Sequence, residues 1–129
     1  MTAPAAQPSV VRFAAVTRRY AKGVGGVAKV SFSVAKGEFV FLTGPSGAGK
    51  STVLKLARME ELPEAGEVRV AGTSSLKVSR TDVAKLRRKI GIVFQDFRLL
   101  EDRTAFDNVA FALEVTGTAT SQIGPRVQK

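Results

Sequence analysis

Residue types and spacing that suit a phosphate group occur near the middle of the sequence, in the run Gly44-Pro45-Ser46-Gly47-Ala48-Gly49-Lys50-Ser51. Its glycines allow backbone N–H groups to turn inward around a concave surface that matches phosphate oxygens. In this pattern Lys50 places an ammonium on the β- and γ-phosphates, Ser51 offers a hydroxyl to Mg²⁺, and Thr52 is placed to reach the α-phosphate. We therefore predict that the cofactors are ATP and Mg²⁺, held by this run together with Thr52.

Two elements must flank such a loop, a strand before it and a helix after it. Glu38 to Thr43 is a mainly apolar run, typical of a strand that is buried on both faces. From Lys50 to about Glu60 the sequence predicts a helix, because apolar residues recur along one of its faces. The helix N-terminus adds roughly half a positive charge where the phosphates would lie. An ordinary glycine-rich turn is the alternative, and the order of strand, loop and helix disfavours it.

Several strands are predicted around this central unit. Val10 to Val16 and the alternating run Val30 to Val34 have strand patterns, and Lys36-Gly37-Glu38 has the composition of a hairpin turn. Because short turns join these two strands to the one at Glu38, we expect an antiparallel subsheet. Glu67 to Ala71 alternates as a further, half-exposed strand.

The second half of the sequence continues the alternation of helices and strands. Thr81 or Asp82 is a candidate cap for a short basic helix that runs through Lys89. Ile90 to Phe94 has the composition of a second buried strand, and a loop from Gln95 to Arg103 follows it. The run Thr104-Ala105-Phe106-Asp107 resembles a capping box that opens a helix ending near Gly117. Alternating strands and helices predict an α/β fold with a parallel sheet beside the antiparallel subsheet.

Composition narrows the function classes. The 129 residues contain no cysteine and no histidine, which excludes disulfides, thiol catalysis and a histidine base. The net charge of +9 suits anionic partners such as a nucleotide or an acidic membrane face, or merely a solvated surface. No apolar run approaches the ~20 residues of a membrane span. We expect a disordered tail over 1–9, one domain over 10–117, and a polar end over 118–129 that is disordered or begins a helical subdomain.

Four features together resemble the nucleotide-binding domain of ABC ATPases, which are P-loop NTPases, and the glycine loop is the first. Tyr20 stands where the family has an aromatic residue that stacks on adenine; a half-buried core tyrosine is the alternative. Gly66 to Gly72 is similar to the strand pair that follows the loop helix in the family. Ile90 to Asp96 resembles the strand that leads to the family's Q-loop. The resemblance implies that Gln95 offers its side-chain carbonyl to Mg²⁺ and to the attacking water, so Lys50 and Gln95 are the candidate catalytic residues.

Within this family the sequence is most similar to the FtsE group of cell-division ATPases, over about Val10 to Gly117. The segments that carry this resemblance are Gly37–Gly44, Phe94–Leu100 and Asn108–Gly117. ATPases of lipoprotein- or peptide-export systems share most of these residues and remain an alternative.

The FtsE resemblance implies a cytoplasmic protein, peripheral on the inner face of the cell membrane, that acts as a homodimer in cell division. It also implies an integral membrane partner like FtsX, bound through the Gln95–Arg103 loop. Exposed Phe97, Leu99 and Leu100 would suit such a docking patch. Folding of these side chains back into the core is an equal alternative.

The family's remaining catalytic parts are not found in the sequence. It has no Leu-Ser-Gly-Gly-Gln signature, no apolar Walker B run ending in Asp-Glu, and no switch histidine; the last acidic residue is Glu114. We therefore expect the N-terminal half of an ABC ATPase domain, which binds nucleotide but does not hydrolyse ATP alone. A sheet without its central neighbours would leave apolar edges open, so we expect marginal stability.

Other readings of the loop fit less well. Guanylate-type kinases share it but start close to it, whereas 43 residues precede Gly44 here. A GTPase would need an Asn-Lys-x-Asp segment, which is not found. A non-catalytic nucleotide-binding module remains open. The basic run Lys85-Leu86-Arg87-Arg88-Lys89 is more typical of a solvated helix face, or of a face near acidic lipid, than of nucleic-acid binding, so no nucleic-acid partner is expected.

Overall fold

The computed structural model describes residues 9–21 and 25–129, so most of the tail predicted to be disordered lies outside the described residues. The chain divides into two compact units, residues 1–87 and residues 88–129. We describe each unit by itself.

The first unit is built on a four-stranded antiparallel sheet in the order β2-β1-β3-β4. The strands are β1 (Ser9–Arg19), β2 (Gly26–Ala35), β3 (Ala65–Val70) and β4 (Thr73–Ser74). β1 lies in the middle, where Phe13 is opposite Phe32 on β2 and Val68 on β3. The rings of Phe13 and Phe32 stack with centroids 4.5 Å apart. The predicted antiparallel subsheet is therefore confirmed, although its third strand is β3 and not the segment that begins at Glu38.

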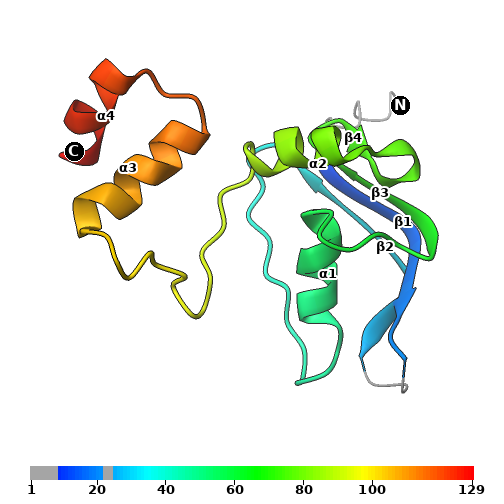
Figure 1. Cartoon of the computed structure of the whole chain (residues 1–129). Helices are drawn as coiled ribbons and strands as arrows, with labels where there is room; N and C mark the ends of the chain where they lie inside the picture. Colours follow the sequence, from blue (N-terminus) through cyan, green and yellow to red (C-terminus); the bar gives the residue numbers. More distant parts are fainter. Residues whose placement is uncertain (1–8, 22–24) are drawn as a thin grey trace. The chain divides into compact units, whose positions relative to one another are not determined.

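Helices cover this sheet and complete the core. α1 (Lys50–Ala57) lies against it and contacts β2 and β3 (Figure 1). A 3-10 turn, η1 (Ser75–Lys77), leads to α2 (Arg80–Arg87). The largest fully buried side chains of the described residues all belong to this unit: Phe13, Val16, Leu56, Val68 and Leu86.

The cap of α2 differs from the prediction. Ser79, and not Thr81 or Asp82, accepts a hydrogen bond from the Asp82 N–H at 3.1 Å. The Asp82 carboxylate in turn accepts from the Ser79 hydroxyl at 2.6 Å. The helix begins earlier than predicted because this reciprocal pair fits the spacing of a capping box better than a cap inside the first turn does.

The sequence analysis predicted two buried strands that the structure does not contain. Both segments, Glu38–Thr43 and Ile90–Phe94, are irregular, so these predictions are wrong. Phe39 is 81% exposed and Val93 is 98% exposed, which is the reverse of the predicted burial. A strand needs a neighbour for its backbone N–H and C=O groups, and no described segment pairs with either run. The α/β class is confirmed, but no parallel pair is present within residues 9–21 and 25–129.

The turn before the first of these segments is present, although no hairpin follows it. Gly37 has φ +80°, as the turn prediction allowed. The Glu38 carboxylate accepts a hydrogen bond from the Ala35 N–H at 2.7 Å and closes the turn. The chain therefore reverses at Lys36-Gly37 without a strand to return along.

The second unit contains α3 (Ala105–Val115) and α4 (Thr120–Val127), which pack on each other. The predicted capping box of α3 is confirmed, with Thr104 and Asp107 bonded reciprocally. Ala110 and Ile123 are the buried apolar residues of this unit. The polar end 118–129 forms a helix over most of its length. Among the residues that the structure describes, no helix is long and apolar enough to cross a membrane.

Candidate nucleotide-binding site

The glycine loop leads directly into α1 and leaves the start of that helix open. Gly44, Gly47 and Gly49 have φ values of +148°, +79° and +91°. The Ala48 N–H donates to the Pro45 carbonyl at 3.2 Å, which turns the loop back on itself. Gly49 is the N-cap of α1 and supplies no side-chain cap. The first N–H groups of the helix can therefore be satisfied by an anion at the loop.

The ammonium of Lys50 lies across this loop. Its Nζ donates to the carbonyl oxygens of Gly44 at 2.6 Å and of Pro45 at 2.7 Å. A cation is thus fixed beside the open helix N-terminus, and both features favour a negative ligand.

The next two loop residues differ in burial. Ser51 is exposed, which suits a hydroxyl that faces Mg²⁺ and phosphate. Thr52 is only 6% exposed and lies in the first turn of α1. No cluster of three or more acidic ligands occurs among the described residues. A hard cation here would therefore depend on hydroxyl, phosphate and water oxygens.

A close backbone approach positions the loop against the sheet. A Cβ atom on Gly49 would lie 2.4 Å from the carbonyl oxygen of Gly26 and 2.8 Å from Cγ1 of Val27. Only glycine fits this position, because the added atom would overlap the backbone of β2. The last glycine of the loop therefore lies directly against the start of β2.

Tyr20 lines a hollow that adjoins the loop. The hollow has a volume of about 340 Å³ and is formed by Arg19, Tyr20 and the segment Gly25–Ala28. Gly26 and Val27 belong both to this hollow and to the contact with Gly49. Tyr20 is half-buried, and its stacking on adenine stays a prediction.

Glu61 is a residue that the sequence analysis missed. Its carboxylate accepts from the Tyr20 hydroxyl at 2.7 Å, from Arg18 Nε at 3.1 Å and from Lys55 Nζ at 3.2 Å. The Tyr20 hydroxyl is the main cause that lowers the pKa of Glu61, and Lys55 and Arg18 add to it. The same carboxylate raises the pKa of Lys55. A single glutamate after a helix carries no sequence signal, because its partners lie up to 43 positions away.

Gln95 belongs to the unit 88–129, where its side chain is exposed. Its part in the site stays a prediction. Phe97 and Leu99 are 78% and 64% exposed and do not fold into the core of that unit.

The loop from Gln95 to Arg103 is held from α3. The Asn108 side chain accepts from the Leu100 N–H at 2.8 Å and donates to the Leu100 carbonyl at 3.1 Å. It also donates to the carbonyl oxygens of Arg103 and Thr104, at 3.3 and 2.9 Å. The sequence gives a weak indication of these contacts, because an asparagine in the first turn of a predicted helix has an amide that can both donate and accept hydrogen bonds.

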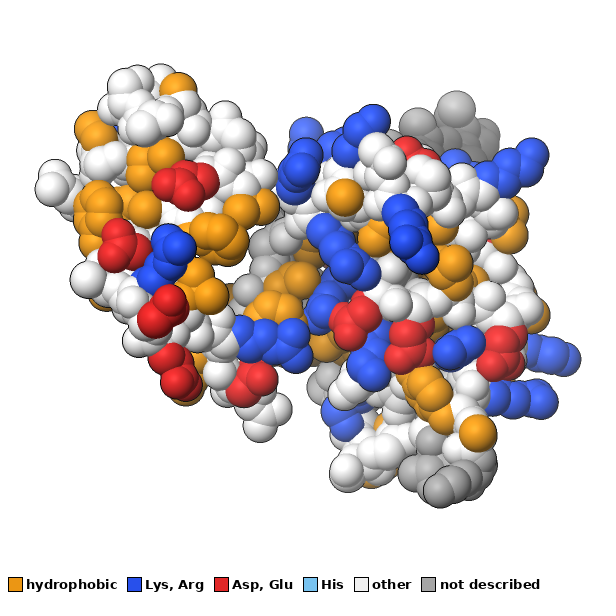
Figure 2. All heavy atoms as spheres, in the orientation of Figure 1, with side chains coloured by type: hydrophobic (Ala, Val, Ile, Leu, Met, Phe, Trp, Pro, Cys, Tyr) orange, Lys and Arg blue, Asp and Glu red, His pale blue; other side chains and the backbone are white. Residues whose placement is uncertain are grey.

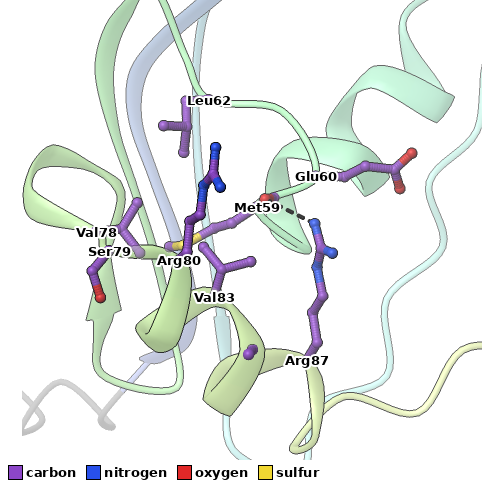
Figure 3. Close-up of a pocket in the computed structure, with 9 residues that line it drawn as sticks. Met59, Glu60, Leu62, Val78, Ser79, Arg80, Val83 and Arg87 are labelled. Atoms are coloured by element: carbon purple, nitrogen blue, oxygen red, sulfur yellow. Dashed lines mark hydrogen bonds between the residues drawn. The ribbon is translucent and has the colours of Figure 1, made fainter.

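A second hollow of about 410 Å³ is lined by none of the loop residues (Figure 3). It lies between the segment that follows α1, from Met59 to Leu62, and α2 with the two residues before it. Arg87 on α2 donates to the carbonyl oxygens of Arg58 and Met59, at 3.4 and 3.2 Å. A cation is therefore bonded to carbonyl groups at the C-terminal end of the helix that begins at the glycine loop, where the helix dipole favours positive charge.

The charge of the surface differs between the two units. Lys and Arg clearly outnumber Asp and Glu in the described part of residues 1–87, whereas the two signs are nearly balanced in residues 88–129. Figure 2 shows many Lys and Arg side chains over the sheet-and-helix unit, with acidic side chains between them. The excess positive charge lies in the unit that carries the loop.

The sheet, the loop and the helix after it have the fold of a P-loop nucleotide-binding domain. The family model described as ABC transporter matches residues 27–128. The chain belongs to the ABC transporter family.

Curated relatives include the cell division ATP-binding protein FtsE of Streptococcus pneumoniae, which is 40% identical over 121 residues, 94% of this chain and 53% of the relative. The protein of the same name from Mycobacterium tuberculosis is 53% identical over 94 residues, 73% of this chain and 41% of the relative. The chain thus spans about half the length of the curated relatives it matches.

Solved structures agree with this assignment. The dimeric post-hydrolysis state of the ATP-binding cassette MJ0796, bound to ADP and Pi, has a TM-score of 0.79 and 32% identity. The match covers 92% of this chain and 54% of that one. The cbiO1 protein of Clostridium perfringens also has a TM-score of 0.79, at 24% identity, and shows the fold alone.

Proposed function

We propose that this chain binds Mg·ATP as the nucleotide-binding part of an FtsE-like ABC ATPase. The observation that carries the proposal is the Lys50 ammonium, held by two loop carbonyl groups beside an uncapped helix N-terminus. A fixed cation and free helix N–H groups at one point are the two features that phosphate recognition needs.

Each part of the nucleotide has a candidate partner in this unit. The loop backbone from Gly44 to Gly49 and the Lys50 ammonium would hold the β- and γ-phosphates, and Thr52 the α-phosphate. Ser51 would face Mg²⁺, which supplies charge neutralisation when bound. Tyr20 would stack on adenine in the adjoining hollow, because an aromatic face suits a base. Gln95 would join the site as a ligand to Mg²⁺ and the attacking water.

Catalysis in this family needs a signature motif, a Walker B strand and a switch histidine, and none is present in this sequence. We propose that the chain binds ATP without hydrolysing it alone. Turnover, dimerisation and cell-division activity are proposals for a longer protein of the FtsE type.

The Gln95–Arg103 loop is the proposed contact with an integral membrane partner like FtsX. Its exposed Phe97 and Leu99 side chains offer apolar area for docking. Such a partner would place the protein on the cytoplasmic face of the membrane.

A titration of the purified chain with a fluorescent ATP analogue and Mg²⁺ tests the central proposal. Lys50→Ala should weaken binding by about 1.5–3 kcal/mol, which is about tenfold or more. Lys77→Ala is the matched control, because it removes an exposed lysine from η1, outside the loop. Phosphate release is followed in the same samples.

Binding that depends on Lys50 and not on Lys77, without phosphate release, is the expected result. Equal losses in both variants would mean that only general charge attracts the nucleotide, and the loop assignment would be wrong. Lys50-dependent hydrolysis would instead refute the statement that catalytic parts are missing.

A further inference from the structure

We propose that Glu61 is a positioning residue for the nucleotide base, which fixes the ring of Tyr20 at the hollow beside the loop. This inference rests on the proposed function, because it gives the tyrosine its role. It adds a residue that lies outside the loop and outside the hollow.

The contacts around Glu61 come from β1, from the residue that follows it and from α1. Arg18 lies near the end of β1, Tyr20 follows that strand, and Lys55 lies on α1. All three donate to the one carboxylate, at 3.1, 2.7 and 3.2 Å. The side chain of Glu61 is only 19% exposed, so water competes weakly for its oxygens. The carboxylate thus joins the sheet, the tyrosine and the loop helix in one cluster.

The cluster restricts the tyrosine ring in two ways. Glu61 holds the hydroxyl group, and two cations lie close to the ring. The guanidinium of Arg18 lies 5.5 Å from the ring centroid, and the Lys55 ammonium lies 5.9 Å from it. Both cations form ion pairs with Glu61, and Arg18 is also paired with Glu64. Arg18 and Lys55 are not among the residues that line the hollow, whereas Tyr20 is. The cluster therefore orients the ring without occupying the space where a base would lie.

The cluster also connects the two ends of the proposed nucleotide site. Lys55 lies on α1, the helix that begins at Lys50. Glu61 follows the same helix and reaches back to Tyr20. Tyr20 and the glycine loop are thus both attached to α1, which fixes the distance between them. A ring whose position is already fixed loses little conformational freedom when a base stacks on it.

The test compares Mg·ATP with Mg·tripolyphosphate, which has the phosphates but no base. Glu61→Ala should weaken Mg·ATP binding by roughly three- to tenfold and leave tripolyphosphate binding unchanged, because base stacking alone depends on the ring. Tyr20→Ala should show the same selectivity with a loss of about tenfold or more. Glu61→Gln keeps the shape and one acceptor oxygen, so a smaller loss is expected.

A double-mutant cycle separates positioning from a general structural role. In a Tyr20→Phe background the hydroxyl contact is already gone, so Glu61→Gln should cause a smaller further loss than in the unaltered chain. Equal losses for both ligands in Glu61→Ala and Glu61→Gln would overturn the inference, because they would mean that the whole site is disturbed.

The single tyrosine gives a readout that needs no nucleotide. The chain has one tyrosine and no tryptophan, so its tyrosine fluorescence reports on Tyr20 alone. A freed ring in Glu61→Ala should show lower emission anisotropy than in the unaltered chain. Unchanged anisotropy would overturn the inference even if ATP binds as proposed. Lower anisotropy in a chain that binds neither ligand would refute the proposed function while leaving the link between Glu61 and Tyr20 in place.

Discussion

The two units of the chain differ in how much apolar surface each buries. The unit 1–87 contains most of the buried apolar residues described: Phe13, Val16, Val53, Leu56, Met59, Val68, Val70 and Leu86. The unit 88–129 contains Ala110 and Ile123. Apolar burial is the main force that stabilises a fold. The first unit can therefore hold a strained loop, whereas the second has little stability to lose before it unfolds. The glycine loop belongs to the unit with the larger core.

Removal of a large side chain from each core is the strongest test of this difference. Phe13 is fully buried and stacks on Phe32, so Phe13→Ala should lower the free energy of unfolding by about 3–5 kcal/mol. Mg·ATP binding should fall with it, because the sheet supports the loop. Thermal unfolding and nucleotide titration measure both effects.

Ile123→Ala is the counterpart in the second unit. It should disturb the packing of α4 on α3 and weaken Mg·ATP binding much less than Phe13→Ala does. Losses of nucleotide binding as large as those in Phe13→Ala would mean that the contrast between the two units is wrong.

Gly49 tests how the loop depends on the sheet. Gly49→Ala would place a Cβ 2.4 Å from the Gly26 carbonyl oxygen at φ +91°. We expect a loss of about 2–4 kcal/mol of stability together with most Mg·ATP binding.

Gly37→Ala is the matched control, since its φ is +80° but no atom lies within 4 Å of the added Cβ. It should cost only the strain of the backbone, about 1–2 kcal/mol, and spare binding. Similar nucleotide affinities in both alanine variants would contradict the role of the close approach to β2.

Local patterns in the sequence predicted the parts of the fold that depend on neighbouring residues. The capping box at Thr104 and Asp107, the strands β1 and β2, and the start of α1 at Lys50 follow from spacing and composition. The glycine loop likewise predicted the ABC family, whose model matches residues 27–128.

The wrong or missing predictions concern residues whose interaction partners are distant in the sequence or are not found among the described residues. Glu38–Thr43 has the composition of a buried strand, but composition does not supply the neighbour with which a strand pairs. Glu61 was missed for a related reason. Its role comes from three donors brought together by folding, and no local pattern signals them.

Asn108 provides a smaller test within the second unit. Asn108→Ala removes three side-chain hydrogen bonds between α3 and the Gln95–Arg103 loop, two at Leu100 and one at Arg103. The loop should open locally at a cost of about 1–2 kcal/mol, because these hydrogen bonds are exposed and net contributions are modest. Faster hydrogen exchange at the Leu100 N–H is the expected signal. An unchanged exchange rate at Leu100 would mean that these contacts do not order the loop.

The smallest expected effect is a difference in pH response between two similar caps. The hydroxyl of Ser79 lowers the pKa of Asp82 on α2, and the hydroxyl of Thr104 lowers the pKa of Asp107 on α3. A carboxylate with a lowered pKa stabilises the fold above its unfolded value, and this contribution is lost as the pH falls through the folded value. Both caps should therefore persist at neutral pH and weaken below about pH 4.

The same acid titration should nevertheless have unequal consequences in the two units. α2 buries Leu86 completely, whereas α3 depends on the small second core, so α3 should lose helix first. Backbone amide resonances of Asp82 and Asp107, followed by NMR from pH 7 to pH 2, measure the two losses separately. Asp107→Asn should flatten the pH response of α3 alone, because its amide oxygen accepts the same hydrogen bonds without titrating. Simultaneous loss of both helices would mean that core size does not set their order, and the contrast between the two units would not extend to their helices.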